Sequence, residues 1–180
     1  ISTIDRFRAI KLGDDMISEY IRPFYSAIVD ERFDDIFEIY KGAATVGLRQ
    51  HALIALGATA DRKNLEVLLS KYKEIESHES VYLYASLGAN LKFRHEIAEF
   101  FMANYEEIKA HINNSGLLRH SLEYTLKNVL ESSFMEKVLE FLKSIEGDAS
   151  MRSAIDKCRD SLALKTKFRG HYKDTVFSIN

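Results

Sequence analysis

The 180-residue sequence is poor in residues that interrupt regular structure, with one proline and eight glycines. Strand-rich folds need many turns, and turns draw heavily on these two residues. Because Cys158 is the single cysteine, the chain cannot form an internal disulfide or a cysteine-rich metal site. We expect Cys158 to be a small, partly buried side chain without a chemical role. No run of about 18 apolar residues occurs, and no membrane segment is expected.

The sequence also lacks an excess of positive or negative charge. The formal net charge is −2, and both signs are interspersed along the chain. A nucleic-acid partner is therefore not expected, because no bulk charge would attract one. The basic run Lys165–Lys173 contains Phe168 and Tyr172, a mixture found in nucleic-acid patches, but it is more typical of a solvated helix end. The first residues lack an apolar signal region, which in a fragment says nothing about the targeting of the parent protein. The lone thiol suits a reducing compartment, so we expect a cytoplasmic location.

Helical periodicity is what the sequence does contain. Apolar residues recur with the spacing of an amphipathic helix over residues 61–75, 92–112 and 133–145, and a last helix is expected from about 148 to 165 or beyond. Ser133 and Glu136 fit a capping box at the start of the third segment. Near the N-terminus, residues 14–29 and 33–40 look helical, and Pro23 should kink or break the first of them.

Two further segments, residues 46–56 and 81–87, are apolar on nearly all sides, as expected of helices packed between neighbours. Each ends in a similar motif, Ala55-Leu-Gly-Ala-Thr59 and Ser86-Leu-Gly-Ala-Asn90. Gly57 and Gly88 stand where a helix end favours a left-handed residue. Thr59 or Asp61 would cap the next helix.

These alternating segments predict an all-α fold, a HEAT/ARM-like right-handed α-solenoid of stacked antiparallel helix pairs. An irregular helical bundle is the competing interpretation. A third pair, over about 116–131 and 133–145, continues the rhythm without the Leu-Gly motif. We expect one domain over 1–180, with repeat pairs over 46–180 and less regular helices over 1–45.

No catalytic centre is recognisable. His95, Glu96 and Glu99 resemble the H-E-x-x-H zinc motif, but Glu99 stands in place of the second histidine. His78 and Glu79 fail the same test, and the six histidines are scattered. We therefore expect no catalytic, cofactor-binding or metal-binding residue, and we expect His95 to lie on a solvated helix face.

One polar helix face stands out. His120, Tyr124 and Lys127 share a face, with Arg119 adjacent, and leucines occupy the opposite face. Polar residues of this kind are commonly exposed to solvent without a binding role, but in a solenoid they can line a concave binding surface.

The stretch from Leu48 to about Lys165 resembles the C-terminal helical domain of zinc aminopeptidases of the aminopeptidase N, puromycin-sensitive and endoplasmic-reticulum types. The family pattern R-x-x-A-L-x-A-L-G-x-S-x-D-x-x-x-L-x-x-L-L matches Arg49–Leu69, with Thr59 in place of serine. The family's next segment, N-x-x-G-R-x-x-A-W-x-F-x-x-x-N-W, is met more loosely over Asn90–Tyr105, where Phe93 replaces glycine and Tyr105 replaces tryptophan.

The resemblance implies a C-terminal fragment of a larger enzyme. The catalytic domain, with its H-E-x-x-H helix and zinc, would then lie upstream as a partner in the same chain, and this fragment alone should be inactive. The helical domain would cap the active site and enclose the peptide substrate, and Arg119, His120, Tyr124 and Lys127 would contact the peptide. The alternative is a stand-alone HEAT-like scaffold that binds another protein.

Overall fold

Helices make up most of the described chain. The computed structural model describes residues 18–171, and side chains from 20 to 168. Within that range the helices are α2 (Ser18–Ile28), α3 (Phe33–Gly42), α4 (Val46–Gly57), α5 (Arg62–Ser70), α6 (Ser80–Ala89), α7 (Arg94–Ala103), α8 (Tyr105–Ile112), α9 (Ser115–Leu126), α10 (Ser132–Ser144) and α11 (Arg152–His171). Short 3₁₀ turns cover Tyr72–Glu74, Ser77–Glu79 and Ala149–Met151, and no strand occurs between residues 18 and 171. The predicted all-α class is confirmed.

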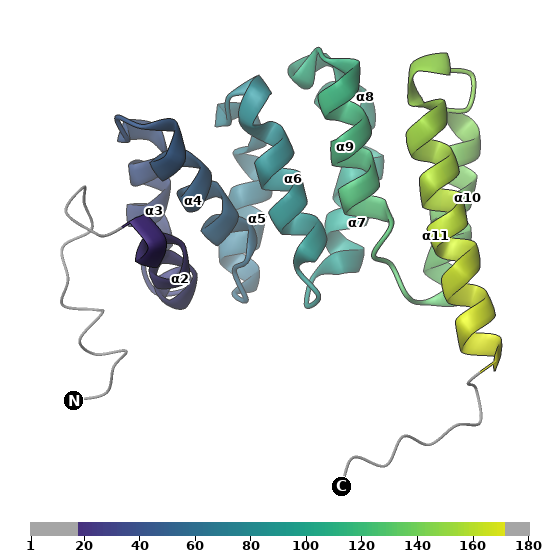
Figure 1. Ribbon diagram of the computed structural model, residues 1–180, viewed down its shortest axis with the longest axis horizontal. Coiled ribbons are helices and arrows are strands. Elements are labelled where there is room, and N and C mark those ends of the chain that lie inside the picture. The colour runs from purple at the N-terminus through teal and green to yellow at the C-terminus, as the bar shows by residue number, and fades with distance from the viewer. Residues whose placement is uncertain (1–17, 172–180) are drawn as a thin grey trace, which may run out of the picture.

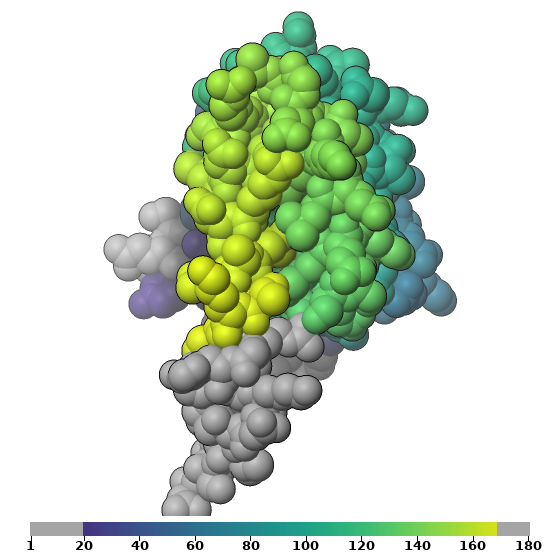
Figure 2. All heavy atoms as spheres, turned by 90° about the vertical axis from the view of Figure 1, so that its right-hand side faces the viewer, coloured from purple at the N-terminus to yellow at the C-terminus, as the bar shows by residue number. Residues whose placement is uncertain are grey.

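The helices stack side by side in two rows (Figure 1). The front row consists of α2, α4, α6, α9 and α11, and each of these contacts the next along the row. The rear row consists of α3, α5, α7 with α8, and α10. One helix pair cannot bury its own apolar face, so neighbouring pairs share a continuous core. Figure 2 looks along the stack onto its C-terminal end, where α10 and α11 lie side by side. The predicted solenoid is therefore confirmed.

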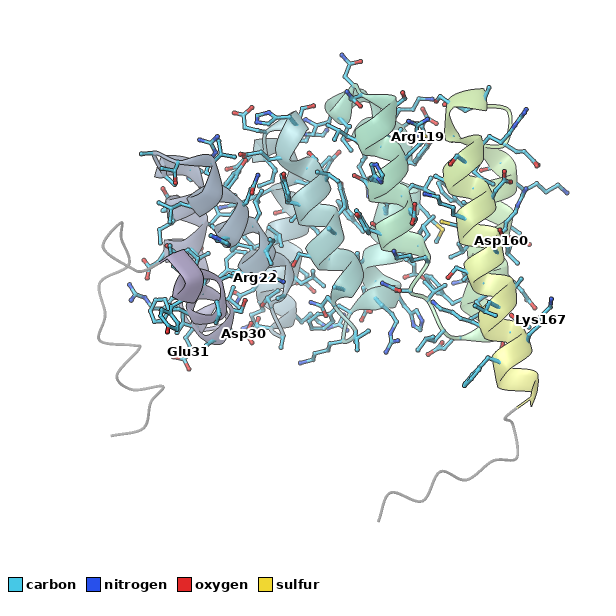
Figure 3. All side chains as sticks on the ribbon, viewed as in Figure 1. Arg22, Asp30, Glu31, Arg119, Asp160 and Lys167 are labelled. Carbon is cyan, nitrogen blue, oxygen red and sulfur yellow. The ribbon has the colours of Figure 1, made fainter. Side chains whose placement is uncertain are left out.

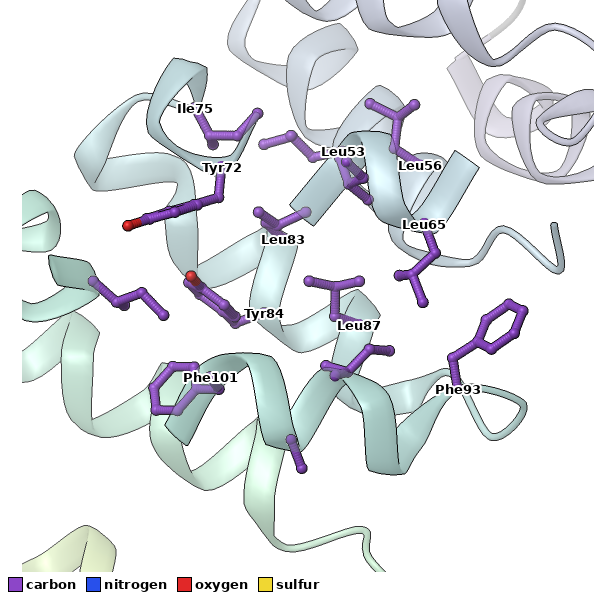
Figure 4. Packing of buried hydrophobic residues seen from close by; sticks show 14 of the residues in the cluster. Leu53, Leu56, Leu65, Tyr72, Ile75, Leu83, Tyr84, Leu87, Phe93 and Phe101 are labelled. Carbon is purple, nitrogen blue, oxygen red and sulfur yellow. The ribbon is translucent and has the colours of Figure 1, made fainter. Parts of the chain in front are cut away.

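The two segments that are apolar on all sides, α4 and α6, occupy the middle of the front row. Leu53 and Leu56 of α4 are fully buried, as are Leu83 and Leu87 of α6 at about 1% exposure or less (Figure 4). Each such side chain contributes about 1.5–3 kcal/mol when it leaves water. Contacts with neighbouring helices bury most of α4 and α6, which explains their weak amphipathic pattern, although Val46 and Tyr82 remain exposed.

Several helix boundaries differ from the sequence prediction. The segment predicted as one helix over 92–112 divides at Asn104, whose Nδ2 donates a hydrogen bond to the carbonyl of Phe100 at 2.8 Å. The helix predicted over 61–75 ends at Ser70 and is followed by a 3₁₀ turn. Helix α2 continues through Pro23 and is not broken there.

One of the predicted helix caps is present in the structure and another is not. Asp61 does cap α5, because its side chain accepts hydrogen bonds from the backbone N–H groups of Lys63 and Asn64. The capping box of Ser133 and Glu136 was wrong. Helix α10 already begins at Ser132, with Glu131 as its N-cap residue, so Ser133 lies inside the first turn.

Gly57 and Gly88 do not adopt the predicted left-handed conformation; within the described residues only Asn113, at φ 44°, has a positive φ. Both glycines instead allow close approach of front-row helices. A Cβ on Gly57 would lie 2.7 Å from the Cβ of Ser86 in α6, and a Cβ on Gly88 would overlap the backbone carbonyl of Tyr124 in α9. The Leu-Gly motif is therefore a helix-packing motif.

Asparagine side chains reinforce the same contacts. The amide of Asn90 donates to the carbonyl oxygens of Gly57 and Thr59, at 3.1 and 2.8 Å. The amide of Asn128 donates to the carbonyl oxygen of Gly88 at 2.6 Å. Each glycine therefore contacts the next front-row helix and also bonds a side chain that follows that helix.

We predict that Gly88→Ala lowers the thermal midpoint by about 5 °C, because a methyl group there meets backbone and forces α6 and α9 apart. Gly57→Ala should lower it less, since Ser86 presents a side chain. Gly47→Ala is the matched control: nothing lies within 4 Å of its Cβ position, and alanine favours helix. Thermal unfolding followed by circular dichroism measures all three. Equal midpoints for the variants at 47 and 88 would contradict the packing role.

Candidate functional site

Negative charge is unevenly distributed between the two rows. Helices α4, α6 and α9 contain a single acidic residue between them, Glu123. Every helix of the rear row contains at least one, and α3 contains three. The central front row is thus a surface on which an anionic group meets little repulsion.

A cleft of about 300 Å³ lies between α9 and α11 on this side. It is lined by Arg119, His120 and Glu123 from α9 and by Ser153, Ala154 and Lys157 from α11. Arg119 is in the second turn of α9 and Ser153 is in the first turn of α11. Because a helix N-terminus carries partial positive charge, the start of α11 adds to the cationic side chains here. We name this feature the α9–α11 cleft; Figure 3 shows Arg119 beside it.

The two cationic side chains of the cleft, Lys157 and Arg119, differ in whether they form an ion pair. The ammonium of Lys157 donates to Oε2 of Glu123 at 3.1 Å. Arg119 is exposed and makes no hydrogen bond or ion pair with a residue in the described part of the chain. Its guanidinium presents donors in a planar fork that suits a carboxylate. The cleft therefore offers one free cation and one that is already paired.

Three of the predicted peptide-contacting residues, His120, Tyr124 and Lys127, form a strip along α9 and its C-cap. The rings of His120 and Tyr124 stack with centroids 6.2 Å apart, and the ammonium of Lys127 lies 4.9 Å from the centre of the Tyr124 ring. Arg119 and His120 line the α9–α11 cleft, whereas Tyr124 and Lys127 are half-buried beside it. Their contact with a peptide stays a prediction.

The sequence prediction missed four residues of the cleft: Glu123, Ser153, Ala154 and Lys157. Glu123 precedes Lys127 by one helical turn, and this spacing could have drawn attention to it. Ser153 and Lys157 carry no such signal, because only the stacking of α11 on α9 brings them there.

A second hollow, of about 470 Å³, lies between α2, α4 and α6. Its lining includes Ala58, Ala85, Ala89 and Arg22. Although larger, it lies at the C-terminal ends of α4 and α6, where the partial charge of the helices is negative. The hollow is also lined by Lys92, whose ammonium donates a hydrogen bond to the carbonyl oxygen of Ala60.

The residues of the near-motif for zinc take part in helix packing. The ring of His95 stacks on Phe134 of α10, with centroids 4.6 Å apart, and its side chain is 24% exposed. The prediction of a solvated face was wrong for His95. Glu99 pairs with Lys137 of α10 at 3.3 Å. Within the described residues, no three His, Cys, Asp or Glu side chains gather as metal ligands would.

The basic C-terminal run also has a packing role where it is described. The ammonium of Lys165 donates to the carbonyl oxygens of Lys127 and Val129, just beyond α9. Burial lowers the pKa of Lys165, and Arg94 and Lys127 lower it further. Lys165 is therefore not a solvated cation, and the end of the run lies outside the described residues.

Comparison with known proteins shows that a family model described as "ERAP1-like C-terminal domain" matches residues 3–164. The chain belongs to the ERAP1-like C-terminal domain family. It is also similar to two proteins of Encephalitozoon cuniculi (strain GB-M1), named "Probable M1 family aminopeptidase 1" and "Probable M1 family aminopeptidase 2". Each is 23% identical over 146 residues, which cover 81% of this chain.

The match covers only 17% of either relative, so this ERAP1-like domain spans a small part of their length. Within residues 18–171 of the domain, no helix is both long enough and apolar enough to cross a membrane. The resemblance inferred from the Leu-Gly segment is thereby confirmed at the level of the family.

The one thiol of this ERAP1-like domain should be unreactive. Cys158 is fully buried, and burial raises the pKa of its thiol to about 12, so the thiolate is scarce at pH 8. We predict that a disulfide reagent such as Ellman's reagent reacts with it only at the rate of unfolding, and rapidly in denaturant. Fast labelling of the native protein would contradict this burial.

Proposed function

We propose that this ERAP1-like domain is the non-catalytic C-terminal part of a zinc aminopeptidase, and that its front row helps to enclose the peptide substrate. The family match and the two aminopeptidase relatives support the first part. The zinc and the H-E-x-x-H helix would belong to a catalytic domain upstream in the same chain, as the family implies. A cytoplasmic location stays a prediction.

The observation that carries the second part is the α9–α11 cleft. A peptide with its N-terminus at a distant active site presents its other end, a carboxylate, to the wall of the enclosing chamber. Arg119, which has no partner among the described residues, provides donors for that group, and the positive end of α11 adds to the attraction. The stacked rings of His120 and Tyr124 provide a flat apolar surface next to it.

The stand-alone scaffold makes a different prediction about the coding sequence. If the proposal is right, the reading frame upstream encodes an H-E-x-x-H motif with a third zinc ligand. A frame without that motif would favour the scaffold.

In the parent enzyme, we predict that Arg119→Ala raises the Michaelis constant for long peptides about three- to five-fold, the effect of losing one exposed charged contact. Aminoacyl reporter amides should be unaffected, because they are too short to reach the cleft. The assay is steady-state hydrolysis of a peptide length series. Lys137→Ala, on the rear row, is the matched control, since that lysine is also exposed, at 63%. An equal change for short and long substrates would mean that Arg119 acts through folding or domain closure.

A further inference from the structure

One carboxylate already occupies the cationic part of the α9–α11 cleft. Each oxygen of Glu123 faces a different lysine: Oε2 lies 3.1 Å from the ammonium of Lys157, and Oε1 lies 3.8 Å from that of Lys127. Its side chain is 21% exposed, less than either lysine. No other acidic residue occurs in α4, α6 or α9. Among the residues that line the cleft, Glu123 is the single acid; Asp156 and Asp160 also belong to α11 but are not among the lining residues.

A peptide's terminal carboxylate is the same chemical group as the side chain of Glu123. A peptide that enters the cleft can meet free Arg119 without disturbing any contact, but it can engage Lys157 only by replacing Glu123. An incoming carboxylate supplies Lys157 with an equivalent acceptor. An incoming amide leaves the ammonium with a weaker, neutral one, because a hydrogen bond between two charged groups is roughly twice as strong as a neutral one.

We propose that Glu123 is a specificity-determining residue, an internal competitor that occupies Lys157 and thereby weakens the binding of ligands with a free carboxylate, while ligands without one are little affected. This inference rests on the proposed function, since it assumes that a peptide reaches this cleft. The Lys157–Glu123 pair suits exchange because Lys157 is 57% exposed, so water and salt weaken the pair and it opens readily.

Two further features fit such an exchange. When Glu123 leaves Lys157, Lys127 remains close to it on the same helix, so the displaced carboxylate keeps a cationic neighbour. Lys127 is itself held over the Tyr124 ring, and its backbone carbonyl is bonded by Lys165. Lys127 thus stays available beside the cleft to the displaced carboxylate.

The test uses the 180-residue protein and two unlabelled decapeptides of identical neutral sequence, one with a free C-terminal carboxylate and one with a C-terminal amide. Binding is measured by ¹H–¹⁵N NMR titration. Glu123→Gln should strengthen binding of the free-acid peptide about three-fold and leave the amide almost unchanged. Glu107→Gln is the matched control, because Glu107 also accepts a hydrogen bond from a lysine, at 2.6 Å from Lys73, but lies in the rear row.

A second background separates competition from a structural role. If Glu123 acts by occupying Lys157, then Glu123→Gln should have no effect on free-acid binding once Lys157→Gln is present. Circular dichroism checks that each variant is folded. The inference is overturned if Glu123→Gln strengthens both peptides equally, weakens the free acid, or acts equally in both backgrounds.

The proposed function fails in a distinguishable way. If neither peptide shifts resonances of α9 or α11 in any variant, peptide binding in this cleft is wrong and the competitor role falls with it. If the wild type binds the free acid and Glu123→Gln changes nothing, peptide binding stands and only the role of Glu123 is lost.

Discussion

The close contact between neighbouring front-row helices is the constraint on which the rest of this structure depends. At Gly88 the backbone of α6 meets the carbonyl of Tyr124 in α9 with no side chain between them, and at Gly57 the backbone of α4 meets Ser86 of α6. The amides of Asn90 and Asn128 bond the carbonyls of the same glycines. The spacing of α6 and α9 is therefore set by a contact with backbone and that of α4 and α6 by a contact with Ser86, and α11 then packs on α9 to form the cleft.

Ion pairs join neighbouring helix pairs along the rear of the stack, but they cannot determine its geometry. Arg62 pairs with Glu96 at 2.7 Å and Lys73 with Glu107 at 2.6 Å. These side chains are largely exposed, and pairs of this kind contribute about 1 kcal/mol or less. The apolar core and the glycine contacts hold the stack together. Charged side chains on the front row are therefore not needed for stability and can bind a ligand. That row is where acidic residues are scarce.

Residues with the same apparent chemistry in the sequence play different parts in the fold. His95 and Glu99 look like a zinc motif, yet both contact α10, one through Phe134 and the other through Lys137. Glu79 lies in a similar His-Glu pair and is fully buried, with Oε1 bonded by Arg49 at 2.9 Å. Leaving such a buried carboxylate without its cation would be strongly destabilising, so Glu79 has a structural role.

The sequence alone determined the fold class, the family and the order of the helices, because apolar periodicity reports burial and the Arg49–Leu69 segment is distinctive. It placed Arg119, His120, Tyr124 and Lys127 on one helix face, since that relation depends only on helical spacing. Tertiary structure decided the rest. The sequence predicted a left-handed backbone conformation for Gly57 and Gly88, whereas the structure shows that they allow close helix packing. The atoms that they contact lie on the following helix, which the local sequence does not reveal. Likewise, Lys157 joins Glu123 from 34 residues away, a pairing that exists only because α11 stacks on α9.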